Sequence, residues 1–375
     1  MDTLKLSPLC VLFFFPFTAS LFAAQPDEAW TKMFDRTSGW SGADGIFTIR
    51  DDVSSNTFFL FSDTLIGDVN PQTGSRSNTK MVNHSFAVLE GNEPNPEKIR
   101  FFYPGDGHSV GLPLTPRTPG QWYWLSDGFL VRNADSAYLY VFLLRMEKAG
   151  QGGAFGFRHL GVDMARFAVK DGEIDFASAK ILEDDPENPR LGVYSPETLT
   201  FGSGVSADAD GYIYVYGFRQ KRGGPRMLTA ARFLPENTEN FKEWRYFAGD
   251  GQWSENFQDT AGITGNVSPE LSVTPMAGKY ALIYTPGTIG SKIAMRLGDS
   301  PVGPFGEERI LYEESVTKEI GHGAFAYNAK AHPAISPAGE LIITYNVNSN
   351  DNEMRIFRFG GIYRPRFIRV RTEDF

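Results

Sequence analysis

Five polar residues stand at comparable points along the chain, each beside an apolar, strand-like segment: Asp44, Asp127, Ser203, Glu270 and His332. Three of them are carboxylates, and carboxylates gathered in one pit repel each other, so that at least one keeps its proton to a higher pH than usual. General acid and base catalysis needs such a mixture of protonated and ionised groups. Taken singly, Asp44-Gly45 and Asp127-Gly128 are also typical of turns. As a recurring set, the five indicate acid and base chemistry.

Other residues could join the same site. Asp63 ends an apolar strand, where it either caps a turn or reaches the site. Glu197 lies in a Ser-Pro-Glu sequence that recurs at Glu270, which makes it a second candidate acid. Strand alternation places three polar side chains on one face: Asn328, Lys330 and His332. Two aromatic residues before Asp127 could stack on a sugar ring or fill the core: Trp122 and Trp124.

The elements that must position these residues follow a repeated phrase: a polar signature, a strand, a turn and an apolar strand. The apolar strands are expected at 57–61, 138–144, 212–218, 280–284 and 341–345. The interval between signatures shortens from 83 residues (Asp44 to Asp127) to 62 (Glu270 to His332), which suits blades of about four strands. The innermost strand of each blade lines the central channel. The sequence therefore predicts an all-β, five-bladed β-propeller with the five polar residues at one channel mouth.

Composition agrees with many short strands and tight turns. The chain has 31 Phe, 15 Tyr, 39 Gly and 23 Pro, and helical periodicity is confined to 27–34 and 236–244. No Pro/Ser-rich linker or charge block divides the chain, so residues 25–375 are expected to form one domain. The arginine-rich segment 364–371 is expected to be a strand that completes the sheet of the first blade, because a closed ring has no exposed edge.

The first residues predict export. Residues 1–24 have a lone Lys5, an apolar stretch from Leu9 to Phe22 and two small residues at the end, the layout of a secretory signal peptide. An uncleaved anchor is the alternative, although the apolar run is shorter than a membrane span. Cys10 lies within this segment, so the mature chain has no cysteine. A disulfide scaffold and a thiol nucleophile are excluded, and the expected location is periplasmic or extracellular.

Charge and motifs exclude several classes of partner. The net charge of −9 disfavours nucleic acid, whose phosphates would be repelled. The five histidines form no tight zinc motif, so no metal or other cofactor is expected. As an alternative, His332 could ligate a structural cation in the channel. Stable membrane insertion of the mature chain is not expected.

Several segments resemble the bacterial propeller proteins known as domain of unknown function 4185 and their relatives. The segments are 42–45 with 59–64, 268–271, 299–304, and 327–333 with 345–348. The resemblance covers nearly the whole mature chain. Some members hydrolyse D-arabinan, and the fold is similar to that of five-bladed glycosidases that act on arabinan and fructan. The resemblance implies a secreted glycoside hydrolase that acts on a bacterial, plant or algal polysaccharide, a furanoside such as arabinan being one candidate.

The implied mechanism is hydrolysis of a glycosidic bond by paired carboxylates. Asp44 is assigned as base or nucleophile, Glu270 as acid, and Asp127 as the group that orients substrate and tunes the acid. The arabinanase and invertase clans take their acid from the third blade, whereas Glu270 falls in the fourth, so Glu197 also stays a candidate. The alternatives are a non-catalytic glycan-binding propeller, and a phosphorylase or lyase with phosphate or uronate held by Arg219, Lys221, Arg296 and Lys330.

Overall fold

The computed structural model describes residues 24–375 apart from 108–113, 151–155, 322 and 351–353. The expected signal peptide, residues 1–24, therefore lies outside the described residues, except for Ala24. In the described part, strands are the main regular structure and the helices are few and short, which confirms the expected all-β class. No helix there is long and apolar enough to cross a membrane.

The strands of the described residues form six antiparallel sheets. The first contains β3 (Phe47–Arg50), β4 (Asn56–Phe61), β7 (Ser85–Glu90) and β8 (Ile99–Phe102). The second contains β9 (Gln121–Arg132), β10 (Ala137–Lys148), β11 (Phe157–Lys170) and β12 (Glu173–Leu182). The third contains β13 (Gly192–Val193), β14 (Thr198–Ala207), β15 (Ile213–Gln220), β16 (Met227–Phe233), β17 (Arg245–Gly249) and β18 (Gln252–Ser254).

Two more sheets follow in chain order, and one small sheet stands apart. The fourth contains β19 (Leu271–Met276), β20 (Lys279–Tyr284), β21 (Lys292–Gly298) and β22 (Arg309–Glu313). The fifth contains β23 (Ala324–Ala331), β24 (Glu340–Ser349), β25 (Arg366–Arg371) and the N-terminal β1 (Gln25–Pro26). The small three-stranded sheet contains β2 (Trp40–Ala43), β5 (Thr64–Val69) and β6 (Arg76–Val82).

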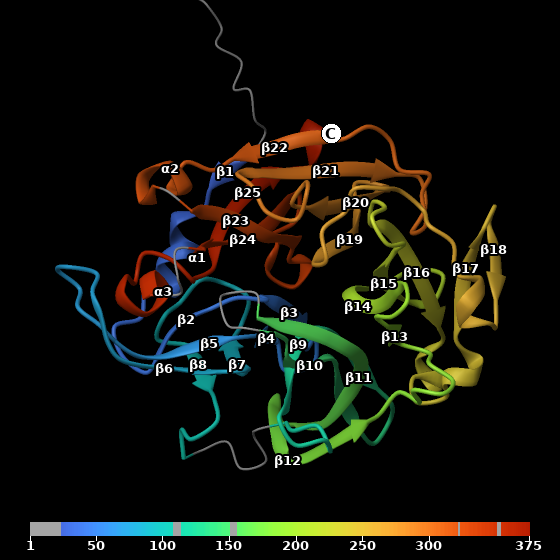
Figure 1. Cartoon of the computed structure of the whole chain (residues 1–375), viewed down its shortest axis with the longest axis horizontal. Helices are drawn as coiled ribbons and strands as arrows, with labels where there is room; N and C mark the ends of the chain where they lie inside the picture. Colours follow the sequence, from blue (N-terminus) through green and yellow to red (C-terminus); the bar gives the residue numbers. More distant parts are fainter. Residues whose placement is uncertain (1–23, 108–113, 151–155, 322, 351–353) are drawn as a thin grey trace, which may run out of the picture.

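The sheets follow one another around the molecule. Strand β3 contacts β9, β9 contacts β14, β14 contacts β19, and β19 contacts β23. The short turn η4 (Pro333–Ile335), directly after β23, contacts β3 again. In Figure 1 the colours accordingly run around the molecule from blue through green and yellow to red. One strand from each of the five larger sheets therefore faces the middle of the molecule.

The first and last parts of the chain meet in the fifth sheet. Gln25 pairs with Arg369 and Pro26 with Ile368, so the N-terminal strand takes the free edge of β25. The backbone N–H of Asp27 donates to the Phe367 carbonyl at 2.8 Å, and its carboxylate pairs with Arg369 at 2.6 Å. The expectation that 364–371 completes the first sheet is therefore wrong. The strand pairs with β24 and β1, and the N-terminus closes the last sheet.

Helices are few and short in the described residues. The expected helix at 27–34 is confirmed as α1 (Glu28–Met33), capped by the Asp27 side chain, which accepts from Trp30 N at 3.1 Å. The expected helix at 236–244 is wrong, because this segment forms two separate 3₁₀ turns, η1 (Pro235–Asn237) and η2 (Phe241–Glu243). The others are α2 (Val316–Ile320), α3 (Met354–Arg358), η3 (Phe257–Asp259) and η5 (Thr372–Asp374).

Helix α1 ties the first and last sheets together. Its Trp30 is 1% exposed and lies against Phe59 of β4 at 6.3 Å and Phe367 of β25 at 5.6 Å between ring centroids. We expect Trp30→Ala to lower the free energy of unfolding by about 3–5 kcal/mol, the usual cost of truncating a buried tryptophan. Chemical denaturation would measure the change. The control is Glu28→Ala on the exposed side of the helix, and equal denaturation midpoints for both variants would contradict this role.

Candidate active site

Irregular strand pairing sets the direction of the side chains at the centre. The register slips at 125–128 in β9, at 201–204 in β14 and at 327–330 in β23, so that extra residues bulge out of each strand. Asp127 and Ser203 lie within two of these bulges. A bulge interrupts the alternation of a strand and redirects a side chain, which is why bulges are frequent beside active sites.

A cavity of about 470 Å³ lies where the sheets meet. Its lining includes the carboxylates Asp44, Asp63 and Glu270, and also Ser203. A second cavity of about 310 Å³ adjoins it, because Asp63, Trp124 and Tyr363 line both. Trp122 lines the second cavity. The two cavities form one cleft, with Asp63 where they meet.

Asp44 and Asp63 are brought together by the small sheet. Asp44 follows β2 and Asp63 precedes β5, its partner strand. The Asp44 N–H donates to the Asp63 carbonyl at 3.2 Å, and the Ser62 N–H donates to the Asp44 carbonyl at 2.9 Å. The two aspartates are thus neighbours across a strand pair, a relation that puts side chains within reach of each other.

Each aspartate has its own hydrogen-bond donors. Oδ2 of Asp44 accepts from the hydroxyls of Tyr327 at 2.8 Å and Tyr363 at 3.1 Å. Oδ1 of Asp63 accepts from the indole N–H of Trp124 at 2.7 Å. Two hydroxyl donors stabilise an ionised carboxylate more than a single indole donor does. The surroundings therefore favour the charge on Asp44.

Burial raises the pKa of both aspartates. Burial, followed by the charge of Glu270, raises the pKa of Asp44 to about 7, against the lowering effect of the two tyrosine hydroxyls. Burial, followed by the charge of Asp44, raises the pKa of Asp63 well above its ordinary value. One member of the pair is ionised more readily than the other, so near neutral pH the cleft holds a proton donor beside a carboxylate.

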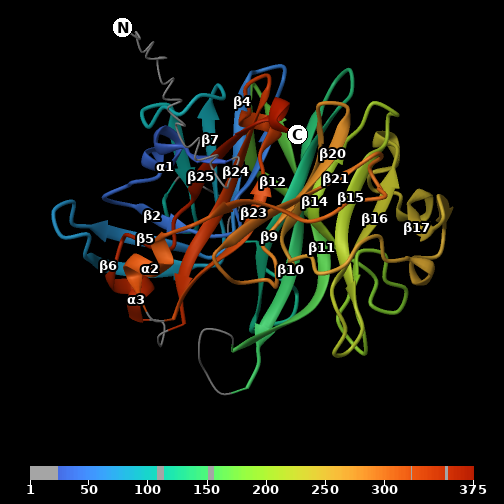
Figure 2. The same ribbon diagram turned by 90° about the horizontal axis from the view of Figure 1, so that it is seen from above.

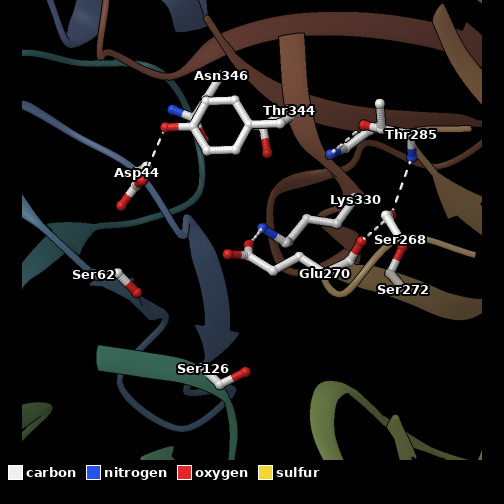
Figure 3. Close-up of polar contacts among 12 residues, drawn as sticks. Asp44, Ser62, Ser126, Ser268, Glu270, Ser272, Thr285, Lys330, Thr344 and Asn346 are labelled. Carbon is white, nitrogen blue, oxygen red and sulfur yellow. Dashed lines mark hydrogen bonds and ion pairs between the residues drawn. The ribbon is translucent and has the colours of Figure 1, made fainter. Parts of the chain in front are cut away.

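Glu270 is paired with a buried cation. Lys330 of β23 is only 2% exposed and forms an ion pair with Glu270, which directly precedes β19. Figure 3 shows this pair with Asp44 across from it. The Lys330 ammonium also lies over the Phe47 ring, 4.2 Å from its centroid. Both partners of such a pair carry charge, so Glu270 is placed to act as a carboxylate.

Asp127 and His332 lie apart from the large cavity. With Lys330 they line a separate cavity of about 50 Å³. Asp127 accepts from the N–H groups of Gly128 at 2.8 Å and Val205 at 2.7 Å, and burial raises its pKa to about 7. The structure therefore brings Asp44, Ser203 and Glu270 together as expected, but the expectation of one shared mouth is wrong for Asp127 and His332.

Both ring nitrogens of His332 are engaged. Nδ1 lies 3.0 Å from the Thr48 hydroxyl, and Nε2 lies 2.6 Å from the Thr344 hydroxyl. Burial, followed by the charge of Lys330, lowers the pKa of His332 well below its ordinary value. This arrangement disfavours His332 as a cation ligand. Among the described residues, no group of three or more His, Cys, Asp or Glu side chains is placed to hold a metal ion.

Two further expectations from the sequence need correction. The trio at 328–332 does not share one face, because the bulge at 327–330 breaks the alternation: Asn328 lines the large cavity, whereas His332 lines the small one. Glu197 does not line the cleft; its half-exposed side chain pairs with Arg219 at 3.1 Å.

Sequence reasoning missed several residues of the site, among them Tyr327, Tyr363, His159 and Arg226. Tyr327 lies within the segment 327–333, which already stands out in the sequence, so it was the easiest of these to find. Tyr363 is more than 300 residues from the Asp44 that it contacts, and no local pattern marks it. His159 and Arg226 lie on strand β11 and just before β16, where the sequence shows only ordinary strand residues.

The fold and the cleft define an all-β protein with neighbouring buried carboxylates where its sheets meet. The chain belongs to the family described as domain of unknown function DUF5005, whose model matches residues 27–372. The motifs resemble a differently numbered family, DUF4185, and kinship with that family is not shown. No curated protein matches the sequence significantly.

One solved structure shares the fold, and others are similar with lower scores. A candidate hydrolase from Bacteroides ovatus is 21% identical, with a TM-score of 0.70 over 92% of this chain and 90% of its own. A GH43_1 enzyme from Xanthomonas citri in complex with xylotriose is 14% identical, with a TM-score of 0.46 over 94% and 90%. An exo-β-1,3-galactanase from Phanerochaete chrysosporium with β-1,3-galactotriose is 11% identical, with a TM-score of 0.44 over 89% and 62%. These identities are low, so function has to be inferred from the side chains of the cleft.

Proposed function

We propose that this protein is an exported glycoside hydrolase whose catalytic pair is Asp44 and Asp63. The observation that carries the proposal is the pair itself: two buried carboxyls on adjoining strands that line one cleft and have different hydrogen-bond donors. In this assignment the Asp63 carboxyl protonates the leaving oxygen. The Asp44 carboxylate activates water or attacks the anomeric carbon.

The proposal moves the acid from Glu270 to Asp63. A general acid must hold a proton in the resting enzyme, whereas Glu270 is matched with the ammonium of Lys330. The negative charge of Glu270 then stabilises the positive charge that develops on the sugar. The same charge raises the pKa of Asp44. Asp127, in the neighbouring small cavity, is a positioning residue for Val205 and for the Lys330 region.

The proposed architecture is a closed propeller of five blades that makes up one domain. Its support is the series of contacts from β3 through β9, β14 and β19 to β23, with η4 returning to β3. The small sheet of β2, β5 and β6 is an addition to the first blade that supplies both aspartates. Trp122 and Trp124 offer aromatic faces along the cleft, on which sugar rings stack. A polysaccharide of bacterial, plant or algal origin is the proposed substrate.

The test is the pH dependence of reducing-end release from a panel of polysaccharides. Asp44 has to be ionised and Asp63 protonated, so kcat/KM is expected to fall below about pH 7, where Asp44 gains a proton, and to fall again at higher pH, where Asp63 loses one. A low-pH limb near about pH 4, the value of an ordinary aspartate, would contradict the assignment.

The same panel separates the rival functions. Phosphate-dependent release of sugar phosphates would show a phosphorylase, and products with a new conjugated double bond would show a lyase. Binding without any cleavage across the panel would favour the glycan-binding propeller. A run with and without chelator checks whether a metal ion takes part.

A further inference from the structure

The large cavity holds a positive charge that no carboxylate of the described residues pairs with. Arg226, just before β16, lines the cavity, and no described carboxylate lies within ion-pair distance of its guanidinium. Nη1 donates to the Thr288 hydroxyl at 2.5 Å, and Nε is buried without a partner. A guanidinium has five N–H donors, so most of its hydrogen-bonding capacity remains for a ligand.

Two other arginines of the third and fourth sheets already have carboxylate partners. Arg219 pairs with Glu197 at 3.1 Å, and Arg296 lies 3.9 Å from Glu308. Both were candidates for holding phosphate or uronate on sequence grounds, and both have internal partners instead. Burial lowers the pKa of Arg226, because the guanidinium loses contact with water and no neighbouring negative charge among the described residues offsets that loss. A bound anion would compensate that charge.

The surroundings of Arg226 suit a sugar that carries the anion. The guanidinium lies over the Phe218 ring, 5.3 Å from its centroid. His159, which also lines the cavity, stacks on Tyr194 at 4.9 Å and has an unpartnered buried Nδ1. Burial and the charge of Arg226 lower the pKa of His159 to about 4, so the imidazole is neutral. Flat rings and a neutral hydrogen-bonding group beside a cation can hold a sugar ring and its acidic substituent together.

The charged residues of the large cavity limit where a negative group of a ligand could bind. The Asp44 carboxylate, with the buried Asp63 beside it, lines the same cavity, and its charge repels an anionic substituent. The positive charge that faces the cavity from Arg226 attracts an acidic group, so such a group is expected beside Arg226 and away from Asp44.

We propose that Arg226 forms an anion subsite and that the ligand of the cleft is an acidic glycan, with a uronate carboxylate or a sulfate ester seated on the guanidinium. The identity of this glycan as a substrate rests on the proposed hydrolase function; its binding does not. A carboxylate or sulfate oxygen pair would accept two N–H groups of Arg226 side by side.

The experiment is calorimetric titration of the full-length mature protein with three sets of oligosaccharides: oligogalacturonates, sulfated galactan fragments, and neutral xylo- and galacto-oligosaccharides. We expect acidic oligosaccharides to bind more tightly than neutral ones of equal length. Arg226→Gln is expected to weaken the acidic ligands on the order of tenfold to a hundredfold, and the neutral ligands less than about threefold. Arg226→Lys should restore part of the loss, because it keeps the charge but not the fork.

Arg222→Gln is the matched control, because it removes the same charge from an exposed position four residues away. It should leave all affinities unchanged. Equal weakening of acidic and neutral ligands by Arg226→Gln, or no binding of acidic ligands by wild type, would overturn the anion subsite. The carboxylate and sulfate arms identify which acidic group binds. Acidic ligands that bind through Arg226 without being cleaved would retain the subsite and reject the hydrolase, and cleavage of neutral glycans that Arg226→Gln leaves untouched would do the reverse.

Discussion

Replacing Asp44 by asparagine is expected to lower glycan hydrolysis by roughly a thousandfold or more, which corresponds to ~4 kcal/mol of lost transition-state stabilisation. Asparagine has nearly the same shape and can still accept from the hydroxyls of Tyr327 and Tyr363, so the cleft should keep its form. Only the charge needed to activate water or attack the sugar is removed. Steady-state kinetics on the best substrate of the panel gives the ratio of kcat values.

The control for Asp44→Asn is Asp52→Asn, because Asp52 is an aspartate of the same region with a side chain that is 94% exposed. It should retain full activity. Both proteins should melt within a few degrees of wild type, and Asp44→Asn should still bind oligosaccharides in calorimetry. Equal turnover by Asp44→Asn and wild type would remove Asp44 from the mechanism.

The sequence predicted the parts of the fold that depend on local pattern. The apolar strands at 57–61 and 280–284 are β4 and β20 within one residue, because runs of aromatic and β-branched residues between turns have few other stable structures. The helix at 27–34 was predictable for a similar reason, since an Asp cap precedes an amphipathic turn. The all-β class is therefore confirmed, and the number of blades stays a proposal.

Closure and site geometry depend on contacts between distant residues, and the sequence does not display them. From the sequence, the edge of β25 could be covered by the first sheet or by the N-terminus. In the structure β1 covers it, through pairing between residues more than 340 positions apart. The bulge at 327–330 separates Asn328 from His332, although strict alternation puts them on one face. A bulge changes the count by a single residue, which the hydrophobic pattern of a buried strand does not record.

The roles of the carboxylates were also hidden in the sequence. Asp63 was one candidate among several because its closeness to Asp44 arises from the separate sheet of β2 and β5. Glu270 was favoured as acid because of its place among the recurring polar residues, and its partner Lys330, 60 residues further along the chain, gave no local sign of the ion pair. Burial and the partner of each carboxyl decide which one keeps a proton, and both are properties of the folded state.

The acid is best identified by comparing Asp63→Asn with Glu270→Gln on two kinds of substrate. Asp63→Asn is expected to lower turnover of a natural glycan by on the order of a hundredfold to ten-thousandfold, the usual contribution of a general acid. The loss of turnover should be much smaller for an aryl glycoside with a good leaving group, because such a group departs with little need of a proton. Glu270→Gln should lower turnover of both substrates by similar factors, because it removes a charge and not a proton donor.

Stability has to be monitored in this comparison. Glu270→Gln leaves the ammonium of Lys330, which is only 2% exposed, without its carboxylate, and breaking such a buried pair typically costs about 3–5 kcal/mol. Activity should therefore be measured well below the melting temperature of each variant. Glu197→Gln, at the half-exposed pair with Arg219, serves as the control and should stay close to wild type. If Glu270→Gln or Glu197→Gln lowers turnover of the natural glycan but spares the aryl glycoside, and Asp63→Asn does not show this pattern, the acid role passes from Asp63 to that glutamate.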